Sequence, residues 1–177
     1  SKDFEGSTVD EENFLFFPQI SSKISFPLIQ KSENYSQTLT PILMPILAPY
    51  NNYTDQQAIN NNNVFSLNRA SNLDQWESGP RINYGIEWFL NLNNNKDLSI
   101  TLGQSAKINK NNNDSSDEIS DYMLASRINL DPKKYIDSSM IVDRENIDIK
   151  ESNINAYFEF DKFKFAIDHD YISDKYS

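Results

Sequence analysis

The sequence predicts an all-β fold: an antiparallel up-and-down meander that forms part of a transmembrane β-barrel of about eight strands. Three observations predict it. Apolar and polar residues alternate with a period of two along several segments of the chain. Turns between these segments are rich in asparagine, and the chain holds 23 Asn but only 4 Gly. Short and long connections alternate along the chain, which is typical of outer-membrane barrels.

The first two predicted strands lie before residue 50. Ile20–Leu28 alternates apolar and polar residues, and the short connection Ile29–Ser36 follows it. Gln37–Ala48 is apolar on both faces. It also contains Pro41 and Pro45, which argue against a regular strand because proline donates no hydrogen bond to a ladder.

The clearest alternation runs from Arg81 to Leu92. It resumes from Leu98 to Ile108, after the Asn-rich turn Asn93–Lys96, so the two segments predict a β-hairpin. Two more hairpins are expected downstream, in the same way. Their strands and turns are Tyr122–Leu130, Asp131–Lys134 and Ile136–Val142, then Ile154–Phe160, Asp161-Lys162 and Phe163–Tyr171.

Three longer connections separate these hairpins: Pro49–Pro80, Asn109–Ile119 and Arg144–Asn153. In a barrel they belong on the extracellular side, so the segment 49–80 is expected to be a long extracellular loop. The polar face of each strand then lines a wet lumen and the apolar face meets lipid. The same alternation also builds soluble β-sandwiches, in which the apolar face is the core, and this alternative remains open.

Composition excludes several classes of function. The net charge of −10 argues against a nucleic-acid partner. Without cysteine the chain has no disulfide or thiolate metal site, and its single histidine, His169, leaves little room for histidine catalysis. His169 lies between Asp168 and Asp170, but a strand points neighbouring side chains to opposite faces, so no metal site is expected. We therefore expect neither an enzyme nor a cofactor.

The segment from Asn63 to Gly85 carries the most specific motif. It reads NVFSLNRASNLDQWESGPRINYG, and it resembles a loop and strand of the LptD family of lipopolysaccharide-assembly proteins, in their C-terminal outer-membrane barrel domain. The matching residues are Phe65, Asn68, Arg69, Asp74, Trp76, Glu77, Gly79, Arg81, Asn83, Tyr84 and Gly85. Ala70, Asn72 and Gln75 depart from the family pattern. Residues 1–177 are interpreted as a fragment of that barrel domain.

The resemblance implies a function without catalytic chemistry. Family members receive lipopolysaccharide from an LptA-like periplasmic bridge and insert it into the outer leaflet of the bacterial outer membrane, together with an LptE-like lipoprotein plug. The bridge is met by an N-terminal domain that this chain is not expected to contain. A passive porin-like channel is the alternative within the same fold class.

Two groups of residues are candidates for the functional site. In the motif loop, opposite charges predict ion pairs that tether the loop over the lumen; a solvated turn is the alternative. This group is Asn68, Arg69, Asp74, Trp76, Glu77, Gly79 and Arg81. The second group, on the polar strand faces, is expected to line the lumen as a saccharide path, a plug contact or hydrated wall. It comprises Asn83, Glu87, Asn91, Ser99, Thr101, Lys107, Asp121, Arg127 and Asn129.

Overall fold

A computed structural model of the chain describes residues 17–50, 63, 65–67, 77–92, 94–108 and 119–173. These residues form one antiparallel sheet, which confirms the predicted all-β meander. Its strands are β1 (Ile20–Ser21), β2 (Ile24–Ser25), β3 (Leu28–Lys31), β4 (Tyr35–Leu47), β5 (Arg81–Leu92), β6 (Lys96–Lys107), β7 (Tyr122–Asp131), β8 (Lys134–Val142), β9 (Ile149–Glu159) and β10 (Lys164–Ile172). No helix in this part of the chain is long and apolar enough to cross a membrane.

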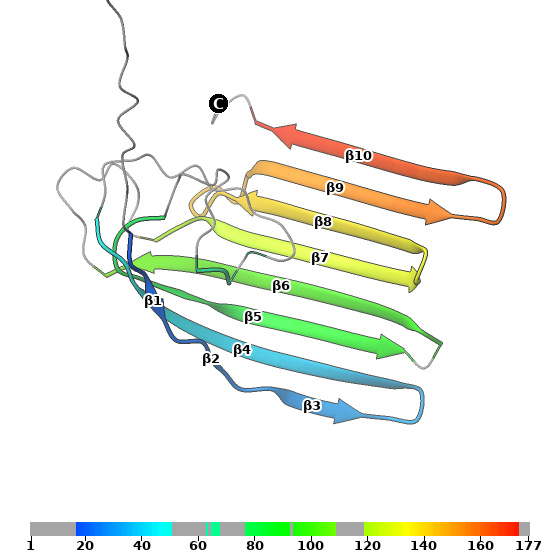
Figure 1. Ribbon diagram of the computed structural model, residues 1–177, viewed down its shortest axis with the longest axis horizontal. Helices are drawn as coiled ribbons and strands as arrows, with labels where there is room; N and C mark the ends of the chain where they lie inside the picture. The colour runs from blue at the N-terminus through cyan, green and yellow to red at the C-terminus, as the bar shows by residue number, and fades with distance from the viewer. Residues whose placement is uncertain are drawn as a thin grey trace, which may run out of the picture.

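From β4 to β10 every strand pairs with the next one along the chain (Figure 1). The short strands β1, β2 and β3 all pair with β4 and together occupy one position at the edge of the sheet. The order β1-β4-β5-β6-β7-β8-β9-β10 therefore has eight positions, the number that the sequence predicted. Both edges are open, as expected for part of a barrel wall.

The two ends of the sheet differ. The four hairpin turns that follow β3, β5, β7 and β9 share one end, on the right of Figure 1, which we call the short-turn end. The connections that follow β4, β6 and β8 leave the opposite, long-loop end. Asn95 in the β5–β6 turn has a positive φ of 61°, in line with the use of asparagine where other chains use glycine.

Two predicted connections are shorter in the structure. Ile29–Ser36 was predicted as a connection, but β3 runs to Lys31 and β4 begins at Tyr35. The sequence predicted a connection over Arg144–Asn153, but β9 already begins at Ile149. Asp143 closes the turn early, because its Oδ1 atom accepts the backbone N–H groups of Glu145 and Asn146, both at 2.8 Å. The backbone N–H of Asp143 also donates to the carbonyl of Asp148 at 2.8 Å. An Asp side chain that bonds the following amides is a common turn closure.

The prolines of β4 all affect the same edge of the sheet. Pro41 and Pro45 lie inside the strand, and their carbonyls accept from Phe26 and Ser22, both at 3.2 Å. In an antiparallel ladder the N–H and C=O of one residue face the same neighbour, so the donors missing at both prolines face the β1–β3 edge. The register between β4 and β5 is unbroken from Tyr35–Leu92 to Ile46–Arg81. The proline edge is therefore the weaker side of β4.

The faces of the sheet are unequally covered. The outer face carries the alternating apolar residues, and many are exposed. Among them are Leu28, Leu39, Leu43, Ile86, Leu102, Ile128, Ile154, Phe165 and Ile167. The buried residues lie on the opposite, polar face, towards the long-loop end: Ile42, Met44, Ile46, Met123 and Ala125, with the polar Arg81, Asn83, Ser105 and Ser139.

Candidate functional site

The sheet register gathers the predicted lumen-facing residues of the strands on the polar face. Arg81 pairs with Lys107, and Glu87 pairs with Thr101. Paired residues lie on the same face of a sheet, and so do residues two apart along a strand. The same rule places Asn83, Asn91, Ser99, Arg127 and Asn129 with them. Asp121 lies immediately before β7 and not in a strand.

An ion pair buried on this face joins the long β4–β5 connection to the start of β5. The Nη2 atom of Arg81 lies 3.1 Å from Oε2 of Glu77, and the two side chains are only 1% and 3% exposed. Glu77 and Arg81 are thus buried and paired with each other. That this pair tethers the loop over the lumen stays a prediction. Asn68, Arg69, Asp74 and Trp76 lie outside the described residues.

Arg81 also anchors a more distant part of the same connection. Its Nη2 atom donates to the carbonyl of Leu67 at 2.5 Å, and its Nη1 atom donates to the carbonyl of Glu77 at 3.1 Å. One guanidinium therefore binds residues 4 and 14 positions away in the chain. The fork of donors that arginine presents suits it to such a role. The connection is held at two separate points on the polar face.

Phe65 packs where two strands lack side chains. Gly85 of β5 pairs with Gly103 of β6, and a Cβ atom on Gly85 would come within 2.8 Å of Cζ of Phe65. The same ring packs against the buried cluster of Met123 and Ala125. Gly85 is required here because a Cβ atom would clash with the carbonyl oxygen of Leu102 in the paired strand, as well as with the phenyl ring. The glycine pair and Phe65 thus form a seat for the loop.

Gly79 shapes the end of this connection. It has a positive φ of 81°, and its N–H donates to the carbonyl of Pro49 at 2.9 Å. A Cβ atom there would lie 2.8 Å from the ring of Tyr50. Glycine adopts this backbone conformation without a steric penalty. The two ends of the connection, at residues 49–50 and 77–80, therefore lie together above the polar face.

The apolar patch beneath this loop is the feature that sequence reasoning missed. Ile42, Met44 and Ile46 lie on the polar face of β4, which was expected to be hydrated, and Ile46 is 0% exposed. A single-layered sheet buries a side chain so completely only where another segment covers it. The signal was present in the sequence, since β4 is apolar on both faces.

A network of polar side chains continues along this face towards the short-turn end. Arg127 lies 3.5 Å from Asp137, donates to Asn129 at 3.1 Å and stacks its guanidinium 4.7 Å from the ring centroid of Tyr135. Asn129 donates to Asp97 at 2.6 Å. These side chains are partly exposed, so they form a hydrated, hydrogen-bonding wall.

A second cluster ties three strands together at the long-loop end. Lys150 lies between Asp121 and Asp143, with its Nζ atom 2.8 and 3.0 Å from their carboxylates. Hydrogen bonds from the backbone N–H of Asn146 and from Lys150 hold the pKa of Asp143 well below its usual range. Asp121 also accepts the N–H of Arg144 at 3.0 Å. The predicted lumen residue Asp121 is thus part of a clamp on the β8–β9 turn.

These features define a class of protein: an antiparallel β-meander wall with an apolar outer face and a polar inner face onto which a long loop is bound. A comparison with protein families matches residues 3–177 to LptD, described as LPS transport system D. The chain therefore belongs to the LptD family, which serves lipopolysaccharide (LPS) transport and assembly and is not a family of enzymes. A search of curated proteins finds no match to the chain.

Proposed function

We propose that this chain is part of the C-terminal β-barrel of an outer-membrane protein that inserts lipopolysaccharide into the outer leaflet. The observation that carries the proposal is the long β4–β5 connection bound on the polar face through the buried Glu77–Arg81 pair. A transporter of a large amphipathic molecule needs a wide lumen, and a wide lumen leaks unless something closes it. A loop fixed inside the wall supplies that closure.

The unequal faces of the sheet support a membrane location. Apolar side chains stay exposed over the outer face, including Leu43 at 45% and Ile167 at 47%. Exposed apolar area of this extent is unfavourable in water and favourable against hydrocarbon. No second sheet packs on this face within the described residues, which counts against the β-sandwich alternative.

The polar wall between the loop seat and the short-turn end offers the surface for cargo or a partner. Hydroxyl, amide and charged groups gather there, with Ser99, Thr101, Asn91 and Glu87 among them. Such groups hydrogen-bond to sugars and to polar protein surfaces alike. We propose that an LptE-like plug lies against this wall, and that an LptA-like bridge delivers lipopolysaccharide through a different domain of the same protein.

The test is conditional depletion of the full-length protein in its own bacterium. Depletion is expected to reduce surface lipopolysaccharide on intact cells, measured by antibody or lectin binding, while total cellular lipopolysaccharide stays unchanged. Re-expression of the wild type restores the surface signal. Unchanged surface lipopolysaccharide after complete depletion would rule out the proposed function.

Conductance separates the proposal from the porin-like alternative. The purified protein in planar bilayers is expected to be nearly closed, because the bound loop obstructs the lumen. A substitution that releases the loop is expected to open it. High, steady conductance of the wild type, together with normal surface lipopolysaccharide on depletion, would favour the passive channel.

A further inference from the structure

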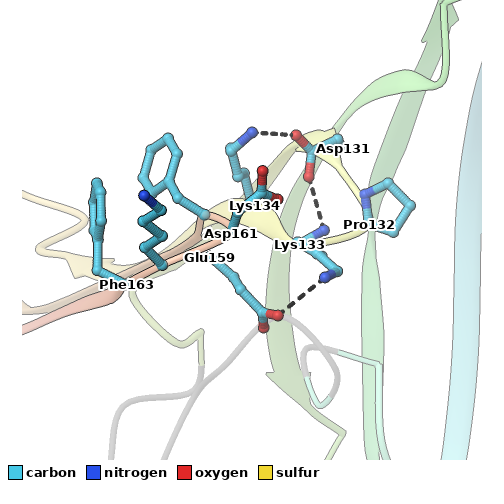
Figure 2. Close-up of a pocket in the computed structure, with 9 residues that line it drawn as sticks. Asp131, Pro132, Lys133, Lys134, Glu159, Asp161 and Phe163 are labelled. Carbon is cyan, nitrogen blue, oxygen red and sulfur yellow. Dashed lines mark hydrogen bonds and ion pairs between the residues drawn. The ribbon is translucent and has the colours of Figure 1, made fainter.

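A hollow lies at the short-turn end between the β7–β8 and β9–β10 turns (Figure 2). Its volume is about 680 Å³. It is lined by Asp131, Pro132, Lys133, Lys134, Glu159, Phe160, Asp161, Lys162 and Phe163. None of these residues belongs to the loop seat or to the predicted lumen wall.

The two turns that form the hollow are fixed to each other. Nζ of Lys133 lies 3.0 Å from Oε1 of Glu159, and the backbone N–H of Glu159 donates to the carbonyl of Lys133 at 2.9 Å. The backbone N–H of Lys133 donates to the Asp131 carboxylate at 2.8 Å. Lys133 therefore connects the carboxylates of Asp131 and Glu159 (Figure 2). Lys164 adds a second cation 3.2 Å from Glu159. The hollow is therefore preformed.

An aromatic surface borders the hollow on the apolar side of the sheet. The rings of Phe160 and Phe163 are stacked with centroids 4.7 Å apart, yet they are 44% and 62% exposed. Phe165 follows them at 52% exposure and pairs with Phe158 on the same face. In membrane barrels, outward-facing aromatic rings near strand ends lie at the level of the lipid headgroups.

Charges of both signs border the same aromatic surface. Nζ of Lys134 lies 5.0 Å from the ring centroid of Phe160 and 2.7 Å from Asp131. Lys162 and Asp161, at the tip of the β9–β10 turn, are exposed, and neither forms an ion pair within the described residues. Four of the 12 lysines of the chain lie in these two turns or at the first residue of the strand that follows. Exposed groups of opposite charge thus stand beside an exposed apolar surface.

We propose that this hollow binds an ethanolamine glycerophospholipid from the membrane leaflet on the short-turn side. Lys162 and Lys134 face the phosphate, Asp161 faces the ammonium group, and an acyl chain lies along Phe160 and Phe163. The mixed charge of the hollow matches a zwitterionic headgroup better than a purely anionic one, because Asp131, Glu159 and Asp161 would repel excess negative charge. The proposal rests on the proposed function only for the membrane location.

Native mass spectrometry of the detergent-purified full-length protein tests this binding. Dioleoyl phosphatidylethanolamine, phosphatidylglycerol and phosphatidylcholine are titrated separately. The wild type is expected to retain one ethanolamine lipid, with at least tenfold weaker retention of the other two. Equal retention of all three lipids would overturn the proposal. Full displacement of the lipid by free phosphoethanolamine would also overturn it, since the acyl chain would then contribute nothing.

Variants test which residue contacts the phosphate of the headgroup and which contacts its ammonium group. Lys162→Gln is expected to weaken ethanolamine-lipid binding about fivefold, the size expected for one lysine near a lipid phosphate. Asp161→Asn is expected to abolish the preference over phosphatidylglycerol while keeping some binding. Lys96→Gln, at the first residue of β6 on the same end of the sheet, is the matched control and is expected to bind as the wild type. If Lys96→Gln loses as much binding as Lys162→Gln, the hollow is not the site.

A measurement on the unaltered protein removes any dependence on folding of the variants. A photoreactive phosphatidylethanolamine is expected to label the peptide that contains Phe160 and Phe163. Labelling spread evenly over the outer face would contradict the proposal. These lipid-binding measurements need no lipopolysaccharide. If no ethanolamine lipid binds, the depletion test of the proposed function is unaffected. If the depletion test fails, lipid binding can still be measured.

Discussion

Replacement of Arg81 by methionine tests whether the buried ion pair holds the long loop. Methionine keeps an unbranched side chain but removes the guanidinium. Glu77 then keeps a carboxylate that is 3% exposed beside an apolar partner, and the carbonyls of Leu67 and Glu77 lose their donor. A lone charge or unpaired carbonyl is unfavourable where water is excluded. The loop is therefore expected to leave the polar face.

The free-energy cost of Arg81→Met follows from the burial of the Glu77–Arg81 pair. Removal of one partner from a buried pair costs about 3–5 kcal/mol. The expected cost is at the lower end, about 3 kcal/mol, because Glu77 regains water when the loop detaches. This corresponds to roughly a hundredfold change in the equilibrium between the bound and the detached loop. The assay is hydrogen exchange of the Gly79 amide, which donates to the carbonyl of Pro49. Its exchange rate is expected to rise about a hundredfold.

Two comparisons make the result decisive. Arg127→Met removes a pair on the same face whose side chains are 39% and 20% exposed, so it is expected to change Gly79 exchange less than about fivefold. Arg81→Met combined with Glu77→Gln is expected to restore part of the protection, because the buried negative charge that Arg81 neutralised is then removed as well. A change below threefold in Arg81→Met itself would refute the tether.

Three further predictions concern the packing of Phe65 on Gly85, the Asp143 carboxylate in the β8–β9 turn and the proline edge of β4. Gly85→Ala is expected to lower stability by about 1–3 kcal/mol and to release Phe65, seen as faster proteolysis of the loop, because the added Cβ clashes with the Leu102 carbonyl of β6 and with the Phe65 ring. The low pKa of Asp143 means that its stabilisation is complete above the ordinary value of 3.8 and is lost as pH falls further. The protection factors of the amides in the β8–β9 turn, which are corrected for the intrinsic pH dependence of amide exchange, should therefore fall in acid, and Asp143→Asn should lose this pH dependence. Pro41→Val restores a ladder donor facing β2, so the Phe26 amide is expected to exchange more slowly; unchanged or faster exchange would show that the missing donor does not weaken this edge.

The strand pattern could be predicted because it depends on local alternation. Arg81–Leu92 was predicted with the bounds that β5 has in the structure. The first predicted strand is present as three short pieces, since its partner β4 offers no donor at Pro41 and Pro45. The loop over Arg144–Asn153 was predicted too long, because the Asp143 carboxylate accepts hydrogen bonds from two backbone N–H groups and closes the turn within a few residues.

The candidate site depended on contacts between distant residues. The charges of the motif predicted ion pairs but not which residues form them, and the burial of the Glu77–Arg81 pair required the apolar patch of β4 beneath the loop. The hydrogen bond from Arg81 to Leu67 joins residues 14 positions apart, and Phe65 packs against Gly85 of β5 and against Met123 and Ala125 of β7. Periodicity contains no information on such contacts.

By itself, the sequence determined the all-β meander, the two unequal faces and the resemblance to the LptD family, because side-chain alternation and motif order are properties of the linear chain. Only the tertiary structure decided that the polar face is partly apolar and covered, and that two turns form a hollow at the short-turn end. These features depend on register and on which segments meet in space. Burial is a property of the neighbours that surround a side chain, and the chain brings those neighbours together only when it folds.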